Sequence, residues 1–269
     1  MKLSQTISNL YVFIFFIFSF VTIVTAQKTI IPKTGSVVFE KAQKVTNQML
    51  YDSTITIFHN KIEKVLKKQM IEEFEKQGMV YDDNSIEVLL SNSVKAFSFE
   101  LTNEVVEKYH IFKDSIITAY RKVNNAIQGD YQLINQNQNT YNIRAKIDST
   151  FIPIKDKLYE HLKEDHISIT EYKDQVKTIN GFDCYKVIII KDEVVNANEE
   201  DISFFKDVFE TMQTQYVLYV TESIKCKYHP VIMYKSILEK YYPLEIRKYS
   251  MPIEGVETIY LLKEFSIKE

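Results

Sequence analysis

The sequence predicts a β-rich α+β fold: an antiparallel sheet with one covered face, one long helix and one or two short helices. Most segments alternate apolar and polar residues, as strands with one buried face do. One long segment instead repeats apolar residues every three or four positions, as an amphipathic helix does. The 269 residues include five glycines, all isolated, which excludes the glycine-rich nucleotide-binding and nucleophile-elbow motifs.

The first 26 residues have the features of a secretory signal peptide. Lys2 precedes an uncharged apolar run at residues 10–24, which is shorter than the ~20 residues of a membrane-spanning helix. Val24 and Ala26 are small enough for the −3 and −1 positions of a cleavage site. The sequence therefore predicts an exported protein with a single mature domain, residues 27–269, that is periplasmic, outer-membrane associated or secreted. A retained N-terminal anchor is the alternative.

Helical insertions are expected near residues 52–77 and 199–213. Asp52 and Ser53 can cap the first helix, and Gly78 can end it. We expect its apolar stripe to pack on the sheet, because a half-buried sheet needs a cover. The stripe consists of Ile55, Phe58, Ile62, Val65, Leu66, Met70 and Phe74. The second helix begins with acidic residues, as the helix dipole favours, and a weaker helical pattern follows at residues 231–240.

About eight to ten strands are expected from the alternation. It is clear at residues 97–101, 141–147 and 167–170. Residues 185–190 and 216–220 are apolar on both faces and predict central strands, the first entered through a tight Asn180-Gly181 turn. Near the end of the chain, one face of the last strand is predicted to carry Ile259, Leu261, Phe265 and Ile267.

No cofactor, metal site or catalytic residue is predicted. The net charge of −3, with interspersed signs, argues against a nucleic-acid partner, which needs a concentrated basic face. His161 and His166 are five residues apart, whereas zinc sites prefer spacings of three or four. The stretches Asp82-Asp83-Asn84 and Glu199-Glu200-Asp201 fit turn and helix-cap roles better than a calcium loop.

The two cysteines, Cys184 and Cys226, raise the question of a disulfide in an exported chain. If the strand ending near Ile190 pairs antiparallel with the strand starting near Gln215, Cys184 lies opposite about Glu222, close to Cys226 but not in register with it. A Cys184–Cys226 disulfide and two separate buried thiols both remain open.

Residues 177–186 (KTINGFDCYK) resemble the I-x-G-aromatic-x-C-x-K segment of the GLPGLI family, which consists of exported proteins, mostly from Bacteroidetes, without an assigned activity. Gly35–Phe39 resembles the opening strand of that family, and Leu218–Ile224 resembles the strand after its cysteine segment. Residues 242–246 (YPLEI) stand at the naming motif, where the leucine-proline-glycine core is replaced. The resemblance covers the first strand and roughly residues 170–267.

The resemblance implies an architecture like that of the LolA lipoprotein carriers, a strongly curved, incomplete antiparallel barrel with an apolar concave face. It implies a non-enzymatic protein that binds a hydrophobic or lipid-like ligand, or a hydrophobic protein segment, in this groove. The lining expected for the groove consists of Phe97, Phe99, Ile188, Ile190, Tyr219, Leu261 and Phe265.

Two other functions stay open. The first is a structural or interaction module with a filled core, whose charged helix face meets a cell-envelope protein. The second is a hydrolase with a dispersed site that includes His161, His166 or His229. An apolar cavity above ~300 Å³ favours ligand binding, and a solid core favours the interaction module.

Overall fold

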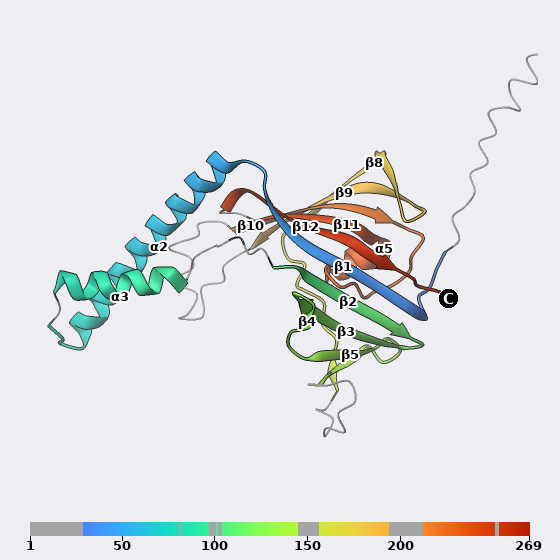
Figure 1. Ribbon diagram of the computed structural model, residues 1–269, viewed down its shortest axis with the longest axis horizontal. Helices are drawn as coiled ribbons and strands as arrows, with labels where there is room; N and C mark the ends of the chain where they lie inside the picture. Colours follow the sequence, from blue (N-terminus) through green and yellow to red (C-terminus); the bar gives the residue numbers. More distant parts are fainter. Residues whose placement is uncertain are drawn as a thin grey trace, which may run out of the picture.

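The computed structural model describes residues 29–80, 82–96, 101, 104–144, 156–193, 212–250 and 253–269. They form one open antiparallel sheet of 12 strands (Figure 1), with one long helix and short helices. The predicted β-rich α+β class is confirmed. The predicted signal peptide, the strand residues 97–100 and the helix residues 199–211 lie outside the described residues.

The sheet runs in the order β7-β6-β5-β3-β2-β1-β12-β11-β10-β9-β8, and β4 pairs with β3. Its strands are β1 (Thr34–Val45), β2 (Val106–Lys113), β3 (Ile116–Val123), β4 (Ala126–Ile127), β5 (Tyr131–Asn135), β6 (Thr140–Arg144), β7 (Lys157–Leu158), β8 (Ile167–Ile179), β9 (Phe182–Glu193), β10 (Met212–Thr221), β11 (Tyr242–Ser250) and β12 (Ile253–Phe265). The strand number exceeds the expected eight to ten, because β4 and β7 are too short to produce an alternating pattern.

The β8–β9 hairpin forms where the turn dipeptide predicted it. Asn180 and Gly181 have φ angles of 47° and 81°, and Ile179 pairs with Phe182 across them. Positive φ at both central residues is characteristic of the type I′ turn, a two-residue hairpin turn whose backbone twist matches that of the flanking strands. Strand β10 then pairs with β9 so that Gln215 lies opposite Ile190, which confirms the predicted pairing.

A bulge in β12 changes which residues share a face. Phe39 of β1 pairs with Leu262, but the preceding Val38 pairs with Glu264, so Lys263 is an extra residue in β12. A bulge of this kind shifts the side chains beyond it to the other face. The prediction that Leu261 and Phe265 share a face is therefore wrong: Leu262 and Phe265 pack against the core, while Leu261 is 49% exposed.

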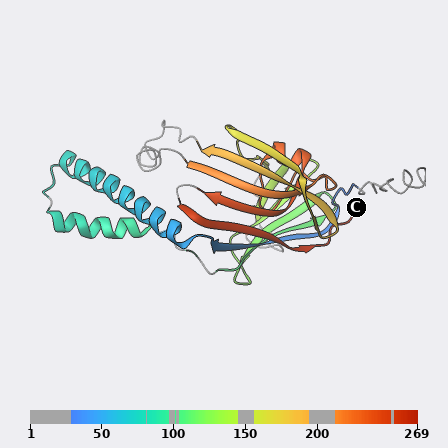
Figure 2. The same ribbon diagram turned by 90° about the horizontal axis from the view of Figure 1, so that it is seen from above.

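The sheet is strongly bent (Figure 2), and its two ends contribute to one hydrophobic cluster. Ile134 of β5 and Ile189 of β9 belong to this cluster together with Ile237 of α5 (Lys235–Lys240). We call residues 222–241 the inner segment. It packs on the face of the sheet that carries Phe39, Val187, Leu218 and Ile246, which we call the inner face. The other side of the sheet is the outer face. The inner segment is thus the main cover of the sheet among the described residues.

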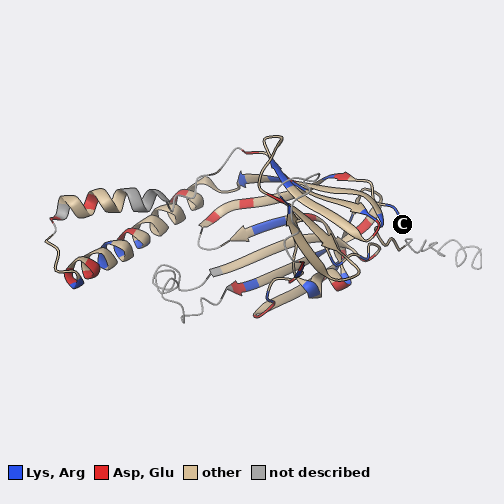
Figure 3. Ribbon diagram, turned by 90° about the horizontal axis from the view of Figure 1, so that it is seen from below, with Lys and Arg blue, Asp and Glu red and all other residues tan. Residues whose placement is uncertain are grey.

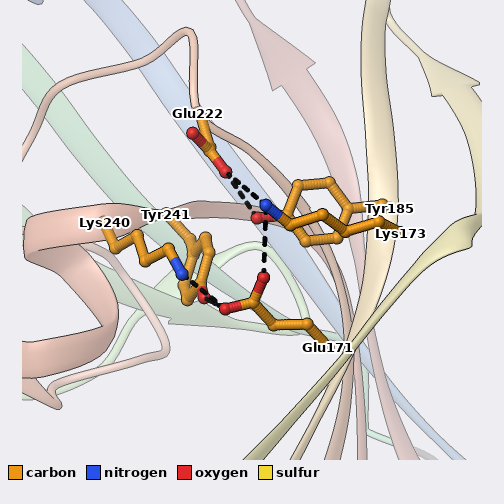
Figure 4. A network of polar contacts seen from close by, with 6 residues as sticks. All are labelled: Glu171, Lys173, Tyr185, Glu222, Lys240 and Tyr241. Atoms are coloured by element: carbon orange, nitrogen blue, oxygen red, sulfur yellow. Dashed lines mark hydrogen bonds and ion pairs between the residues drawn. The ribbon is translucent and has the colours of Figure 1, made fainter.

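Polar contacts tie both ends of the inner segment to β8 and β9 (Figure 4). At its start, Glu222 accepts a hydrogen bond of 2.6 Å from the Tyr185 hydroxyl. At its end, Lys240 and Tyr241 both donate to Glu171 of β8. Lys240 and Tyr241 lower the pKa of Glu171 to about 2, so the carboxylate holding α5 is ionised at neutral pH.

The long helix α2 (Gln48–Lys76) does not cover the sheet. It begins at Asn47, whose side chain accepts from the Leu50 N–H, five residues before the expected Asp52 cap, and it ends before Gly78 as predicted. Phe58 and Ile62 pack against Ile253 of β12. Beyond this contact α2 projects from the sheet, beside a second, unpredicted helix α3 (Asp83–Ala96) (Figure 1). The inner segment already fills the place that the helix was expected to take.

Charges of both signs occur along α2 and on the strands (Figure 3). None of the helices in the described part of the chain is both long enough and apolar enough to cross a membrane. Asp82 accepts from the Ser85 N–H at the start of α3, which confirms the cap role predicted for this acidic turn.

Candidate functional site

A cavity of about 370 Å³, open to solvent, lies on the inner face between the inner segment and strands β2, β3 and β5. A second cavity of about 400 Å³ lies among turn residues near Ile31 and Asp114 and is lined by no buried polar side chain. The first is the candidate site because it reaches the core. Its lining consists of Lys108, Tyr109, His110, Ala119, Tyr120, Arg121, Gln128, Gly129, Asp130, Gln132, Tyr159, His229, Pro230 and Met233.

Strand alternation and strand pairing place three basic residues of the lining, Lys108, His110 and Arg121, on the same face. His110 pairs with Val37 and Lys108 with Phe39, so both side chains share the inner face with these core residues. Arg121 of β3 lies directly opposite Lys108 in the β2–β3 ladder, where side chains are close neighbours.

Positive charge accumulates around Lys108. The Lys108 ammonium lies 5.5 Å from the ring centroid of Tyr260, a cation–π distance. Burial lowers the pKa of Lys108, and the charges of Lys41, Arg121 and Lys248 lower it further. Within the described part of the chain, no carboxylate forms an ion pair with Lys108 or Arg121. Asp130 stands exposed at the rim of the cavity.

His110 is one of two buried histidines that line the cavity, and His229 is the other. The His110 side chain is 5% exposed, and its Nδ1 has no hydrogen-bond partner among the described residues. Burial lowers the pKa of His110 to about 3, and the charge of Lys108 adds to this. The imidazole is therefore neutral at physiological pH and has unused hydrogen-bonding capacity.

His229 has a structural role instead. Its Nε2 lies 2.9 Å from the Pro243 carbonyl, and its Nδ1 accepts from the N–H groups of Val231 and Ile232. Two donors at Nδ1 fix the neutral tautomer that carries its proton on Nε2. Burial lowers the pKa of His229 to about 3. Because both nitrogens are engaged by backbone, His229 positions the inner segment and is unavailable as a catalytic base.

None of the described residues of the predicted groove lining borders the cavity. Phe265 packs against the core, and its ring lies 5.3 Å from that of Phe182. Ile188 and Ile190 flank the fully buried Ile189 and so point to the outer face. The two remaining described residues, Tyr219 and Leu261, both pair with the outer-face residue Glu245. Tyr219 nevertheless packs against the main hydrophobic cluster, whereas Leu261 is exposed. Phe97 and Phe99 lie outside the described residues.

The cysteines are two free, buried thiols, so the disulfide left open by the sequence is not formed in this structure. Cys184 Sγ lies 3.6 Å from the Phe182 carbonyl, and Cys226 Sγ lies 3.2 Å from that of Tyr228. The chain turns inward after β10, which carries Cys226 into the inner segment and away from the register position opposite Cys184. Burial raises the pKa of each thiol to about 12, which makes both poor nucleophiles.

The other histidines predicted as alternatives do not converge on the cavity. His161 Nε2 lies 3.0 Å from the Lys227 carbonyl, and His166 occupies a turn with φ of 59°. Among the described residues, no group of three or more His, Cys, Asp or Glu side chains could hold a metal ion.

Sequence reasoning missed Lys108, His110 and Arg121. The signal was present in Glu107–Phe112, where Lys108, His110 and Phe112 alternate with other residues and therefore share one face. The alternation was hidden because both faces of β2 are mixed: Glu107 on the outer face is 4% exposed and contacts Lys263.

Comparison with known proteins adds no relative: no family model, no curated protein and no solved structure matches this chain.

Proposed function

We propose that this protein is an exported, non-enzymatic binding protein that holds a hydrophobic, lipid-like ligand against the inner face of its open sheet. The observation that carries the proposal is the cavity of about 370 Å³ beside the main hydrophobic cluster. Ala119, Tyr159, Pro230 and Met233 give it an apolar wall. Its size falls within the range of small-molecule sites.

The chemistry of the lining favours binding over catalysis. The described lining contains no serine, threonine or cysteine, and His229 already uses both ring nitrogens. The expected export and the resemblance to the GLPGLI family support a role in the periplasm or at the outer membrane, and both remain predictions.

Native mass spectrometry of residues 27–269, purified from an exporting host and followed by organic extraction, tests the proposal. We expect a co-purifying or titratable lipid, which is lost in Met233→Glu, where the half-buried Met233 lines the cavity. Leu261→Glu on the outer face is the matched control and should keep the lipid, since Leu261 is 49% exposed. A protein that stays empty with every lipid and detergent would contradict the proposal.

A protein-interaction module is the second candidate function. The observation that favours it is the pair α2 and α3, which projects from the sheet and exposes Ile57, Val88 and Leu89. Exposed apolar side chains on a projecting element are typical of contact surfaces. An empty cavity in the experiment above would leave this candidate in place.

A further inference from the structure

Charged residues of the central strands are paired with opposite charges on the outer face of the sheet but not on the inner face around the cavity. On the outer face, Lys263 pairs with Glu40 and Glu107, and Arg247 pairs with Glu245 and Glu257. On the inner face around the cavity, Lys108 and Arg121 face each other without a carboxylate within ion-pair distance in the described chain.

This arrangement leaves a surplus of positive charge beside a partly buried site. Lys41 pairs with Tyr260 in the β1–β12 ladder and Lys248 pairs with Tyr216 in the β10–β11 ladder, so both belong to the same inner face as Lys108. Burying a cation without a compensating anion costs free energy. A ligand that brings a negative charge to the half-buried Lys108 would remove this cost, and the exposed Arg121 would add a second positive charge next to it.

The polar groups of the cavity suit an oxyanion. The Arg121 guanidinium presents a planar fork of donors that matches carboxylate and phosphate oxygens, and Lys108 adds a point charge. His110 supplies a buried imidazole whose Nδ1 has no partner among the described residues, and Gln128 and Gln132 line the same wall. Tyr159, Pro230 and Met233 line the cavity as well, so apolar atoms of a ligand can lie next to its anionic group.

We propose that this cavity selects amphiphiles with an anionic head group, a carboxylate or phosphate bound by Lys108 and Arg121, while the apolar part lies against Tyr159, Pro230 and Met233. The inference rests on the proposed function, because it specifies which lipid-like ligands the inner face accepts.

Calorimetric titration of the mature chain tests the inference with three probes: oleate and oleyl alcohol below their aggregation concentrations, and inorganic phosphate. We expect oleate to bind at least ten-fold more tightly than the alcohol. Lys108→Met and Arg121→Met should each weaken oleate binding at least ten-fold and weaken binding of the uncharged alcohol much less. Lys64→Met, which removes the same charge from an exposed position on α2, should bind oleate like the unaltered protein.

The results distinguish failure of the charge selection from failure of lipid binding itself. Equal affinity for oleate and the alcohol would overturn the charge selection and leave lipid binding standing. Binding of phosphate but of neither amphiphile would show a site for small free anions, and would overturn both proposals. No binding of any probe would also overturn both. Thermal unfolding of every variant checks that it is folded. Recovery of oleate affinity in Lys108→Arg, which keeps the positive charge, would show that the loss in Lys108→Met comes from the charge.

Discussion

Two buried histidines show how single residues determine the pH response of this protein. His229 and His110 are 2% and 5% exposed, and burial lowers the pKa of each to about 3. Their pKa in the unfolded chain is about 6.5. Between these values the unfolded chain binds protons that the folded protein does not, so the free energy of unfolding rises with pH through this window.

We predict that acidification below about pH 6.5 destabilises the fold, by about 1.4 kcal/mol per pH unit for each of the two histidines. The contribution is complete above pH 6.5 and lost progressively toward pH 3. Urea unfolding of His110→Gln at pH 6 and pH 4.5 should show a slope lower by about 1.4 kcal/mol per pH unit than that of the unaltered protein. An unchanged slope would show that His110 titrates normally in the folded protein.

At the residue scale, sequence reasoning located His229 but not its role. The residue was one of the histidines considered for a hydrolase site, yet its bonds to Val231, Ile232 and Pro243 depend on how the inner segment folds back on the sheet. The local sequence pattern does not predict this fold-back, because the inner segment has little regular structure outside α5.

At the scale of elements, the junction of β12 and α2 depends on one glycine. Gly255 has φ of 73°, and a Cβ built there would lie 2.4 Å from the Asn47 carbonyl oxygen. The Gly255 carbonyl in turn accepts from the N–H groups of Thr46 and Asn47. The close approach holds the start of α2 against the sheet.

We predict that Gly255→Ala destabilises the protein more than Gly129→Ala. Both positions have positive φ, but the Cβ at Gly129 would meet nothing within 4 Å. Both variants incur the backbone strain of about 1 kcal/mol, so the additional loss in Gly255→Ala, which we expect to be about 1–3 kcal/mol, measures the clash. Equal losses in chemical denaturation would contradict the close approach.

Because α2 and the sheet belong to two different hydrophobic clusters, we predict that α2 can unfold locally while the sheet stays folded. Ile62, fully buried, belongs to the small cluster between α2 and β12, whereas Ile246 belongs to the main cluster. We expect Ile62→Ala to speed amide hydrogen exchange within Gln48–Lys76 while β9 to β11 stay protected. Ile246→Ala should instead lower the global free energy of unfolding by about 2–5 kcal/mol. Global loss of protection in Ile62→Ala would show that α2 and the sheet unfold as one unit.

The sequence predicted elements with strong local signals and missed those without them. The Asn180-Gly181 turn, the end of α2 at Gly78 and the β9–β10 pairing each follow from a few neighbouring residues. The bulge at Lys263 and the short strands β4 and β7 leave no pattern. They are set by contacts between distant parts of the chain, so single-sequence periodicity does not contain them.

At the scale of the whole molecule, the inner segment determines where open space remains on the inner face. The segment occupies much of the inner face, and the open space that remains lies toward β2, β3 and β5, where the cavity is. The predicted lining on β9, β10 and β12 does not border this cavity, because alternation identifies the two faces of a strand without saying which part of a face a distant segment will cover.

Photo-crosslinking with a diazirine fatty acid, followed by peptide mass spectrometry, tests the central claim most directly. We predict adducts on the peptides that contain Tyr159 and Met233, competed away by unlabelled oleate and lost in Met233→Glu. Adducts confined to outer-face residues such as Ile188 or Leu261, or to the exposed apolar residues of α2 and α3, would contradict the claim that the inner face of the sheet is the ligand site.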